Sequence, residues 1–155
     1  MSNKERPDLT KIIERIEFPD SYRMSFIINT LVLPAYDDIK QSLGFNRGDC
    51  ILLMCLAHYE ELTAQDVVAM SRRPRNSISR SVHRMLEEGY LSRSPHAEDK
   101  RQVWLRITDK GRQLHQELIR NFIELEQGFF GVLSEEEHTN LDKILTKLSL
   151  HAADL

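Results

Sequence analysis

The stretch RRPRNSISRSVHR, residues 72–84, is the part of the sequence that most constrains the fold. It contains five arginines, one histidine and no acidic residue, whereas the whole chain of 155 residues has a formal net charge of −3. Between residues 71 and 106 there are nine Lys/Arg and four Asp/Glu, a balance of +5, so the rest of the chain carries −8. A basic segment in an acidic chain favours an anionic partner at that segment.

On a helical wheel of about 100° per residue, the basic stretch separates into an apolar stripe and a polar face. Ile78, Val82 and Met85 form the stripe and are predicted to be buried. The polar side holds Asn76, Arg80 and His83, flanked by Ser77, Ser79 and Arg84. Arg and Asn can each pair with a base edge through two hydrogen bonds, and short serines allow close approach to phosphate. The alternative is a solvated cationic face, but the stretch contains no acids for intrahelical pairing.

The residues before the basic stretch predict a short helix and a tight turn. Thr63 and Asp66 have the spacing of a capping box at the start of TAQDVVAMS. Pro74 suits the first turn of the basic helix, and Gly89 is placed to end it. A short helix, a tight turn and a basic helix are the elements of a helix-turn-helix.

After Gly89 the hydrophobic period changes from that of a helix to that of a strand. Val103, Leu105 and Ile107 alternate with more polar neighbours, and residues 90–94 (YLSRS) are the expected partner strand. The polar segment 95–101 (PHAEDKR) then forms a hairpin tip. We interpret this ribbon as the wing of a winged helix-turn-helix.

Two cations at the wing tip, Lys100 and Arg101, are expected to reach DNA. An arginine at such a tip can enter the minor groove, where the negative potential is enhanced. Asp99 would repel phosphate, so we expect it to structure the wing. For Lys100, an ordinary solvated turn lysine is the alternative.

Further helices are expected before and after the winged helix-turn-helix in the sequence. Residues 21–43 form a mostly apolar helix that Pro34 should kink or break and Gly44 should end. Asn46 can cap a nearly all-apolar, central helix through residue 59. Thr108 and Ser134 are the expected caps of two long helices. The first of these has an apolar stripe of Leu114, Leu118, Phe122, Leu125 and Phe129.

The predicted fold is mainly α with a small two-stranded β-wing. We expect one subunit over residues 1–155, with a winged helix-turn-helix lobe at 46–110 and helical dimerisation regions at 9–43 and 109–150. No segment has the length and apolarity of a membrane span, and the start lacks the apolar core of a secretory signal, so we expect a cytoplasmic protein.

Three segments together resemble the MarR family of bacterial transcriptional regulators. They are LTAQDVVAMS (62–71), NSISRSVHRMLEEGYLSRS (76–94) and EDKRQVWLRITDKG (98–111), and the resemblance extends over roughly residues 21–150. It implies a homodimer on a pseudo-palindromic double-stranded DNA operator, with the basic helices in major grooves and the wings in minor grooves. By this resemblance Asn76, Ser77, Ser79 and Arg80 face bases or phosphates, and Arg101 faces the minor groove. The basic turn, the helical wheel and the wing tip add further predicted DNA contacts, namely Arg72, Arg73, Arg75, His83, Arg84 and Lys100. Many members have a glycine in the turn before Pro74, where this chain has Ser71-Arg72-Arg73.

The resemblance also implies regulation, typically a repressor that a small aromatic acid or phenol releases from DNA. Candidate ligand contacts are Arg23, Phe26, Tyr36, Met54 and His58, for which core packing or an ordinary surface position is the alternative. Cysteine-based redox sensing through Cys50 or Cys55 stays open, although the simpler interpretation is two buried thiols. A helical dimer that docks a protein without binding DNA is a third possibility.

Catalytic and metal-binding patterns are not found in the sequence. There is no Gly-x-Ser-x-Gly, no phosphate-binding glycine loop, no His-x-x-x-His and no Cys-x-x-Cys. We therefore expect neither an enzyme nor a bound metal or cofactor.

Overall fold

The structure, a computed structural model, describes residues 8–95 and 102–155. The elements in chain order are α1 (Leu9–Arg15), α2 (Pro19–Ile27), the π-helix η1 (Ile28–Val32), α3 (Leu33–Leu43), α4 (Arg47–Ala57), α5 (Ala64–Ser71), α6 (Arg75–Glu87), β1 (Leu91–Pro95), β2 (Val103–Ile107), α7 (Asp109–Phe130) and α8 (Glu135–Ala153). The described part is mainly helical with one two-stranded antiparallel sheet, as the sequence predicted.

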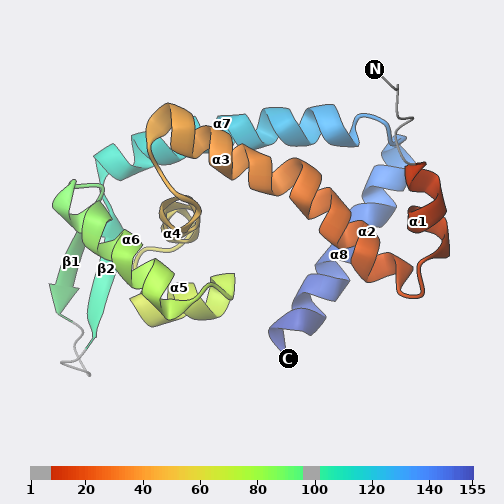
Figure 1. Cartoon of the computed structure of the whole chain (residues 1–155). Helices are drawn as coiled ribbons and strands as arrows, with labels where there is room; N and C mark the ends of the chain where they lie inside the picture. The colour runs from red at the N-terminus through yellow and green to blue at the C-terminus, as the bar shows by residue number, and fades with distance from the viewer. Residues whose placement is uncertain (1–7, 96–101) are drawn as a thin grey trace, which may run out of the picture.

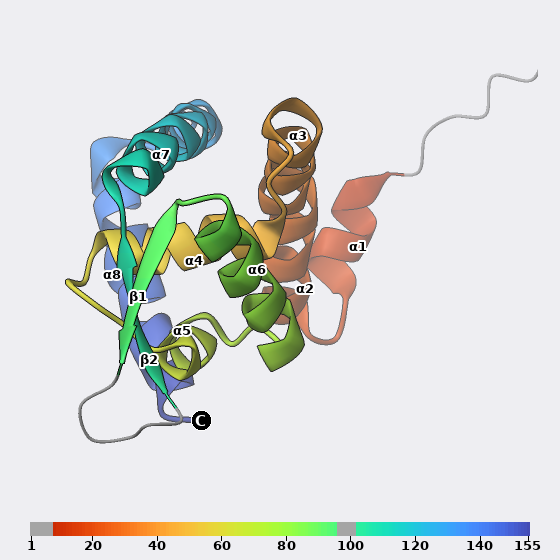
Figure 2. The ribbon, with the colours of Figure 1, turned by 90° about the vertical axis from the view of Figure 1, so that its left-hand side faces the viewer.

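The elements are arranged as a lobe and an arm. The lobe contains α4, α5, α6 and the β1–β2 ribbon, and α3 and α7 run from it toward the arm of α1, α2 and α8 (Figure 1). Turned by 90°, the view shows α6 with the β-ribbon on one side and α3 on the other (Figure 2). The arrangement thus leaves α6 at the surface of the lobe.

Pro34 changes the helix pitch without ending the helix. The chain stays helical from Pro19 to Leu43, but residues Ile28–Val32 form a π-helical turn directly before the proline. The N–H of Leu33 bonds to the carbonyl of Ile28, five residues back. A widened turn accommodates a ring that cannot donate a backbone hydrogen bond. Of the kink or break predicted at Pro34, the break does not occur, and Gly44 (φ 77°) ends the helix as predicted.

Side-chain caps fix the starts of four helices at the predicted residues. Asn46, Thr63, Thr108 and Ser134 each accept a hydrogen bond from a backbone N–H in the first turn of the helix that follows. Each satisfies a donor that the helix cannot pair internally. Capping boxes at Asn46, Thr63 and Ser134 add the reciprocal bond from the cap's own N–H.

The core of the lobe is built around α4, as its apolar sequence predicted. Cys50, Leu52, Leu53 and Leu56 are fully buried. Other elements pack fully buried side chains into the same cluster, namely Val67, Ile78, Met85, Leu105 and Leu118. Burial of one such side chain contributes about 1.5–3 kcal/mol, so this cluster is what positions α6 on the lobe.

The ribbon pairs β1 and β2 in the register Leu91↔Ile107 to Pro95↔Val103. Residues 90–94 were predicted as the first strand, so the observed strand is shifted by one residue. An isolated bridge adds Leu62 to the other side of Leu105, with N–O distances of 2.9 and 3.1 Å. The predictions for Asp99, Lys100 and Arg101 lie outside the described residues.

The arm exposes a large apolar surface. On α8, Ile144, Leu145 and Leu148 are 42–56% exposed, although they follow one helical stripe. Leu9, Ile12, Met24, Ile27 and Ile28 are also exposed on α1, α2 and η1. None of the helices within 8–95 and 102–155 is both long enough and apolar enough to cross a membrane.

Candidate nucleic-acid interface

The basic helix α6 is oriented as its hydrophobic stripe predicted. Ile78 and Met85 are fully buried and Val82 is half-buried. Ser81, which the stripe did not include, is also buried and lies against Gly48 of α4. The exposed side of α6 holds Arg75, Asn76, Ser79, Arg80 and His83, and Ser77 is half-buried at its edge. One face of the helix is thus a continuous row of polar side chains that can donate hydrogen bonds.

Two of these outward side chains are held by neighbours on α6 itself. The Nε of Arg80 donates to the carbonyl of Asn76 at 3.3 Å. Nε2 of His83 lies 3.2 Å from the Glu87 carboxylate, and both side chains are more than 60% exposed. Exposed contacts of this kind contribute roughly 0.3–0.5 kcal/mol, so DNA could displace them at little cost.

The start of α6 has no side-chain cap, because Pro74 occupies the N-cap position. Proline cannot accept a hydrogen bond through its side chain, but its carbonyl accepts from the N–H of Ser77 at 2.9 Å. The N–H groups of Arg75 and Asn76 are left for another acceptor. A helix N-terminus with free N–H groups favours an anion. Arg75 is the first residue of α6, and Arg73 lies two residues before it in the chain.

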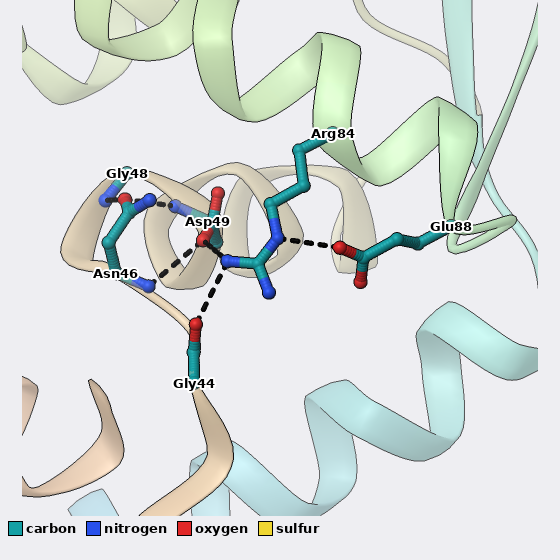
Figure 3. Close-up of polar contacts among 6 residues, drawn as sticks. All are labelled: Gly44, Asn46, Gly48, Asp49, Arg84 and Glu88. Carbon is teal, nitrogen blue, oxygen red and sulfur yellow. Dashed lines mark hydrogen bonds and ion pairs between the residues drawn. The ribbon is translucent and has the colours of Figure 1, made fainter. Parts of the chain in front are cut away.

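Arg84 points away from the outward face and into the lobe (Figure 3). Its Nη1 lies 2.9 Å from the Asp49 carboxylate and 2.9 Å from the carbonyl of Gly44. Its Nε donates to Glu88 at 2.7 Å, and its guanidinium stacks over the Phe45 ring at 4.8 Å. The bond to Glu88, with the nearby Asp49 charge, raises the pKa of Arg84. This arginine therefore ties α6 to α4, whereas sequence reasoning grouped it with the DNA contacts.

Asp49 is the buried centre of that contact and was not singled out from the sequence. Its side chain is fully buried, and its Oδ2 accepts from the N–H of Asn46 at 2.9 Å as well as from Arg84. The spacing of Asn46 and Asp49 is that of a capping box, which was a local signal for this role. The link to Arg84, 35 residues away, has no local signal.

The turn between α5 and α6 has an arginine in a backbone conformation that favours glycine. Arg72 has φ 52° and ψ 22°, the left-handed conformation, and among the described residues it is the one non-glycine with positive φ. Its Nη2 donates to the carbonyls of Ala152 and Ala153 at the end of α8. A left-handed L-residue costs about 1–2 kcal/mol relative to glycine, and this side-chain contact offsets part of that cost.

Comparisons with known proteins agree with this geometry. The MarR family model matches residues 43–102. The chain is 27% identical over 108 residues to the HTH-type transcriptional regulator BilQ of Clostridium symbiosum, covering 70% of this chain and 75% of that protein. It is 24% identical over 98 residues to the HTH-type regulator YwhA of Bacillus subtilis, covering 63% and 70%.

Solved structures share the fold over most of the chain. The transcriptional regulator SlyA has a TM-score of 0.74 at 20% identity, covering 87% of this chain and 95% of that one. A MarR mutant from E. coli in complex with operator DNA has a TM-score of 0.69 at 19% identity, covering 92% and 99%.

Residues 43–102 thus match the MarR family model, and the chain resembles regulators of that type in sequence and in fold. These similarities support a winged-helix transcriptional regulator.

The five candidate effector contacts come from α2, α3 and α4, including the C-cap residue of α4. Arg23 on α2 ion-pairs with Asp20 at 3.5 Å and donates to the carbonyl of Ile13. Phe26 stacks on Tyr22, at a ring distance of 6.4 Å. Tyr36 lines a cavity between α3, α4 and the α5–α6 turn. Met54 is half-buried on α4.

The fifth candidate, His58, lies at the C-terminal end of α4. It stands edge-on to His115 of α7, with 6.3 Å between ring centres. Burial lowers the pKa of His115, and His58 and Arg112 lower it further. No cluster of three or more metal-ligating side chains is found in the part of the chain that the structure describes.

The two cysteines differ in exposure, but burial raises the thiol pKa of both. Cys50 is fully buried, and burial together with the charge of Asp49 raises its pKa to about 12. Cys55 is half-buried, and burial raises its pKa as well. Because the thiolate is the reactive form, both sites disfavour rapid oxidation.

Proposed function

We propose that this chain is a homodimeric repressor that binds a pseudo-palindromic operator and leaves it when a small aromatic acid or phenol binds. The observation that carries the DNA-binding part is the exposed face of α6. Arg75, Asn76, Ser79 and Arg80 project from a helix whose opposite face is anchored in the core. Arg recognises guanine and Asn recognises adenine through paired hydrogen bonds in the major groove.

The dimer is supported by the apolar surface of the arm. A second copy would shield these apolar side chains from water. They are the stripe of Ile144, Leu145 and Leu148 on α8 and the exposed apolar side chains of α1 and α2. In a dimer the two α6 helices would reach half-sites about one helical turn apart. The dimerisation regions proposed from the sequence, 9–43 and 109–150, contain these residues.

Release by a small molecule is supported by a cavity beside α6. The cavity has a volume of about 400 Å³ and lies between α5, α6 and β2, where Arg75, Ile78, Ser79 and Val68 line it. A ligand there would contact the same Arg75 and Ser79 that we assign to DNA, so the two would compete. The solved BpsR of Bordetella bronchiseptica, a fold neighbour, is described as regulated in its DNA binding by 6-hydroxynicotinic acid.

The alternatives are less well supported. Redox control through Cys50 or Cys55 is disfavoured by the burial of both thiols and by their raised pKa values. A protein-docking role without DNA does not explain why Asn76 and Arg80 are exposed together on one helix. Salt separates this alternative from DNA binding, because phosphate neutralisation makes DNA affinity fall steeply with salt concentration.

The test is fluorescence anisotropy with duplex DNA from upstream of the chain's own gene, with a random duplex as control, across a salt series. Tight, salt-dependent binding that exceeds the control supports the proposal. The complex is then titrated with aromatic acids and phenols, and a fall in anisotropy identifies the ligand. Absence of binding to a library of duplexes at low salt would contradict DNA binding.

A further inference from the structure

We propose that a second cationic site, beside the start of α6 on its α3 side, binds one backbone phosphate of the operator. This basic pocket is lined by Leu33, Tyr36, Asp37, Lys40, Asn46, Arg47, Gly48 and Arg73. The inference rests on the proposed DNA-binding function and extends it, because it gives Lys40 and Arg47 a role that the helix-turn-helix pattern does not assign.

The basic pocket is a concave site to which three separate elements contribute a cation. Its volume is about 320 Å³, and Lys40 comes from α3, Arg47 from the first turn of α4 and Arg73 from the α5–α6 turn. Asp37 is the one acidic side chain in the lining, so the formal charge of the lining is +2. Two excess positive charges in one concave site favour an anion.

The arginines of the basic pocket retain unused hydrogen-bonding capacity. The Nε atoms of Arg47 and Arg73 are both buried and have no hydrogen-bond partner among the described residues. A buried donor without an acceptor costs about 1–3 kcal/mol, and an oxyanion would remove that cost. The guanidinium of Arg47 stacks over the Tyr36 ring at 5.1 Å, which fixes its plane and leaves its edge for an acceptor.

Close packing places the basic pocket next to the recognition helix. A side chain at Gly48 would collide with Ser81 and crowd Ser77, so α4 and α6 meet there without intervening atoms. Because Gly48 also lines the basic pocket, the pocket adjoins α6. Its residues Tyr36 and Lys40 come from α3, which lies on the side of α6 away from the β-ribbon (Figure 2).

The dimensions of B-DNA favour a phosphate at this position. A helix of about 10–12 Å diameter fills a major groove about 12 Å wide, so the two phosphate backbones pass along its two sides. The β-ribbon covers one side of α6, and the basic pocket covers the other. Lys40 and Arg47 would then position the lobe on the duplex without reading sequence.

The experiment compares Arg47→Gln and Lys40→Gln with Lys143→Gln, which removes an equal charge from an exposed position on α8. We expect each pocket variant to lower the affinity for operator and random duplex by the same factor, about tenfold. The slope of log K against log salt should become shallower by about 0.9 for each phosphate lost, and a dimer has two such sites. The melting temperature of the unbound protein checks that each variant is folded.

The source of the phosphate is tested with DNA that carries one neutral methylphosphonate at successive backbone positions. One position should weaken wild type but leave Arg47→Gln unaffected, which would identify the bound phosphate. Unchanged DNA affinity in both pocket variants would overturn the inference. If inorganic phosphate then stabilised wild type and not Arg47→Gln against heat, the pocket would bind a free anion instead. Failure of the proposed function is a different result, since wild type itself would not bind either duplex.

Discussion

The guanidinium of Arg72 lies 2.7 Å from the carbonyl oxygen of Ala153, so the turn that precedes α6 is bonded to the last turn of α8. The two residues are 81 positions apart in the chain. A cation at a helix C-terminus is stabilised by the partial negative charge of the unpaired carbonyls. The contact links the DNA-facing lobe directly to the arm that we assign to dimerisation.

Two substitutions of Arg72 should distinguish the effect of its backbone conformation on stability from the effect of its side-chain contact. Arg72→Gly removes the contact but relieves the left-handed conformation at φ 52°. Arg72→Ala removes the contact and keeps the strain. We expect the alanine variant to be less stable than the glycine variant by about 1 kcal/mol in urea denaturation. Equal stability of the two would mean that Arg72 does not adopt this conformation.

The Arg84–Asp49 pair should contribute to stability more than to DNA recognition. Arg84→Met would leave the fully buried Asp49 carboxylate without its cation. We expect the free energy of unfolding to fall by about 1–3 kcal/mol. This is less than for a fully buried pair, because the Arg84 side chain is 35% exposed and solvent partly screens its charge. Adding Asp49→Asn should recover part of the loss in chemical denaturation. The exposed Arg80→Met is the matched control, and a similar loss there would contradict the inward role of Arg84.

Gly111 should be required for the packing of α7 against the lobe. A Cβ at this position would collide with the backbone carbonyl of Tyr90, which already accepts from Thr108 at 3.0–3.1 Å. We expect Gly111→Ala to destabilise the fold by about 1–3 kcal/mol in chemical denaturation. Gly128→Ala in the same helix meets no atom within 4 Å, so it should be neutral or stabilise by up to about 1 kcal/mol. The reverse order would contradict the close approach.

Short-range sequence patterns predicted most helices and strands. The features that they did not predict depend on contacts between residues far apart in the chain. The caps at Asn46 and Thr63 depend on spacings of three residues, which are visible in the sequence. The bridge of Leu62 to Leu105 is a single residue pair without a period, so no pattern reveals it.

The same limit applies to the site. The wheel placed Arg80 outward correctly because Ile78 and Met85 define the buried side. It could not show that Arg84, at the flank, would turn toward Asp49. The inward contact depends on the packing of α4 against α6, which local periodicity does not contain.

The cysteines should be slow to react while the protein is folded. Burial raises the pKa of Cys50 from 9.0 to about 12, so its thiolate is scarcer in the folded than in the unfolded chain. A raised thiol pKa stabilises the fold fully below about pH 9 and loses this effect as the pH approaches 12. We expect iodoacetamide to modify Cys50 at pH 8 much more slowly in native protein than in urea. Equal rates would contradict the burial of Cys50 and reopen redox control.

Arg80 gives the most direct test of base recognition. Its side chain is exposed opposite the buried stripe, so Arg80→Ala should leave the melting temperature unchanged. If Arg80 pairs with a base, the variant should lose about 1–3 kcal/mol of binding free energy to the operator and much less to a random duplex. Arg120→Ala, which removes an exposed arginine from α7, is the control for net charge. An equal loss of binding free energy on both duplexes would mean that Arg80 contacts phosphate. Asn76 and its neighbours would then be the residues that recognise the base sequence.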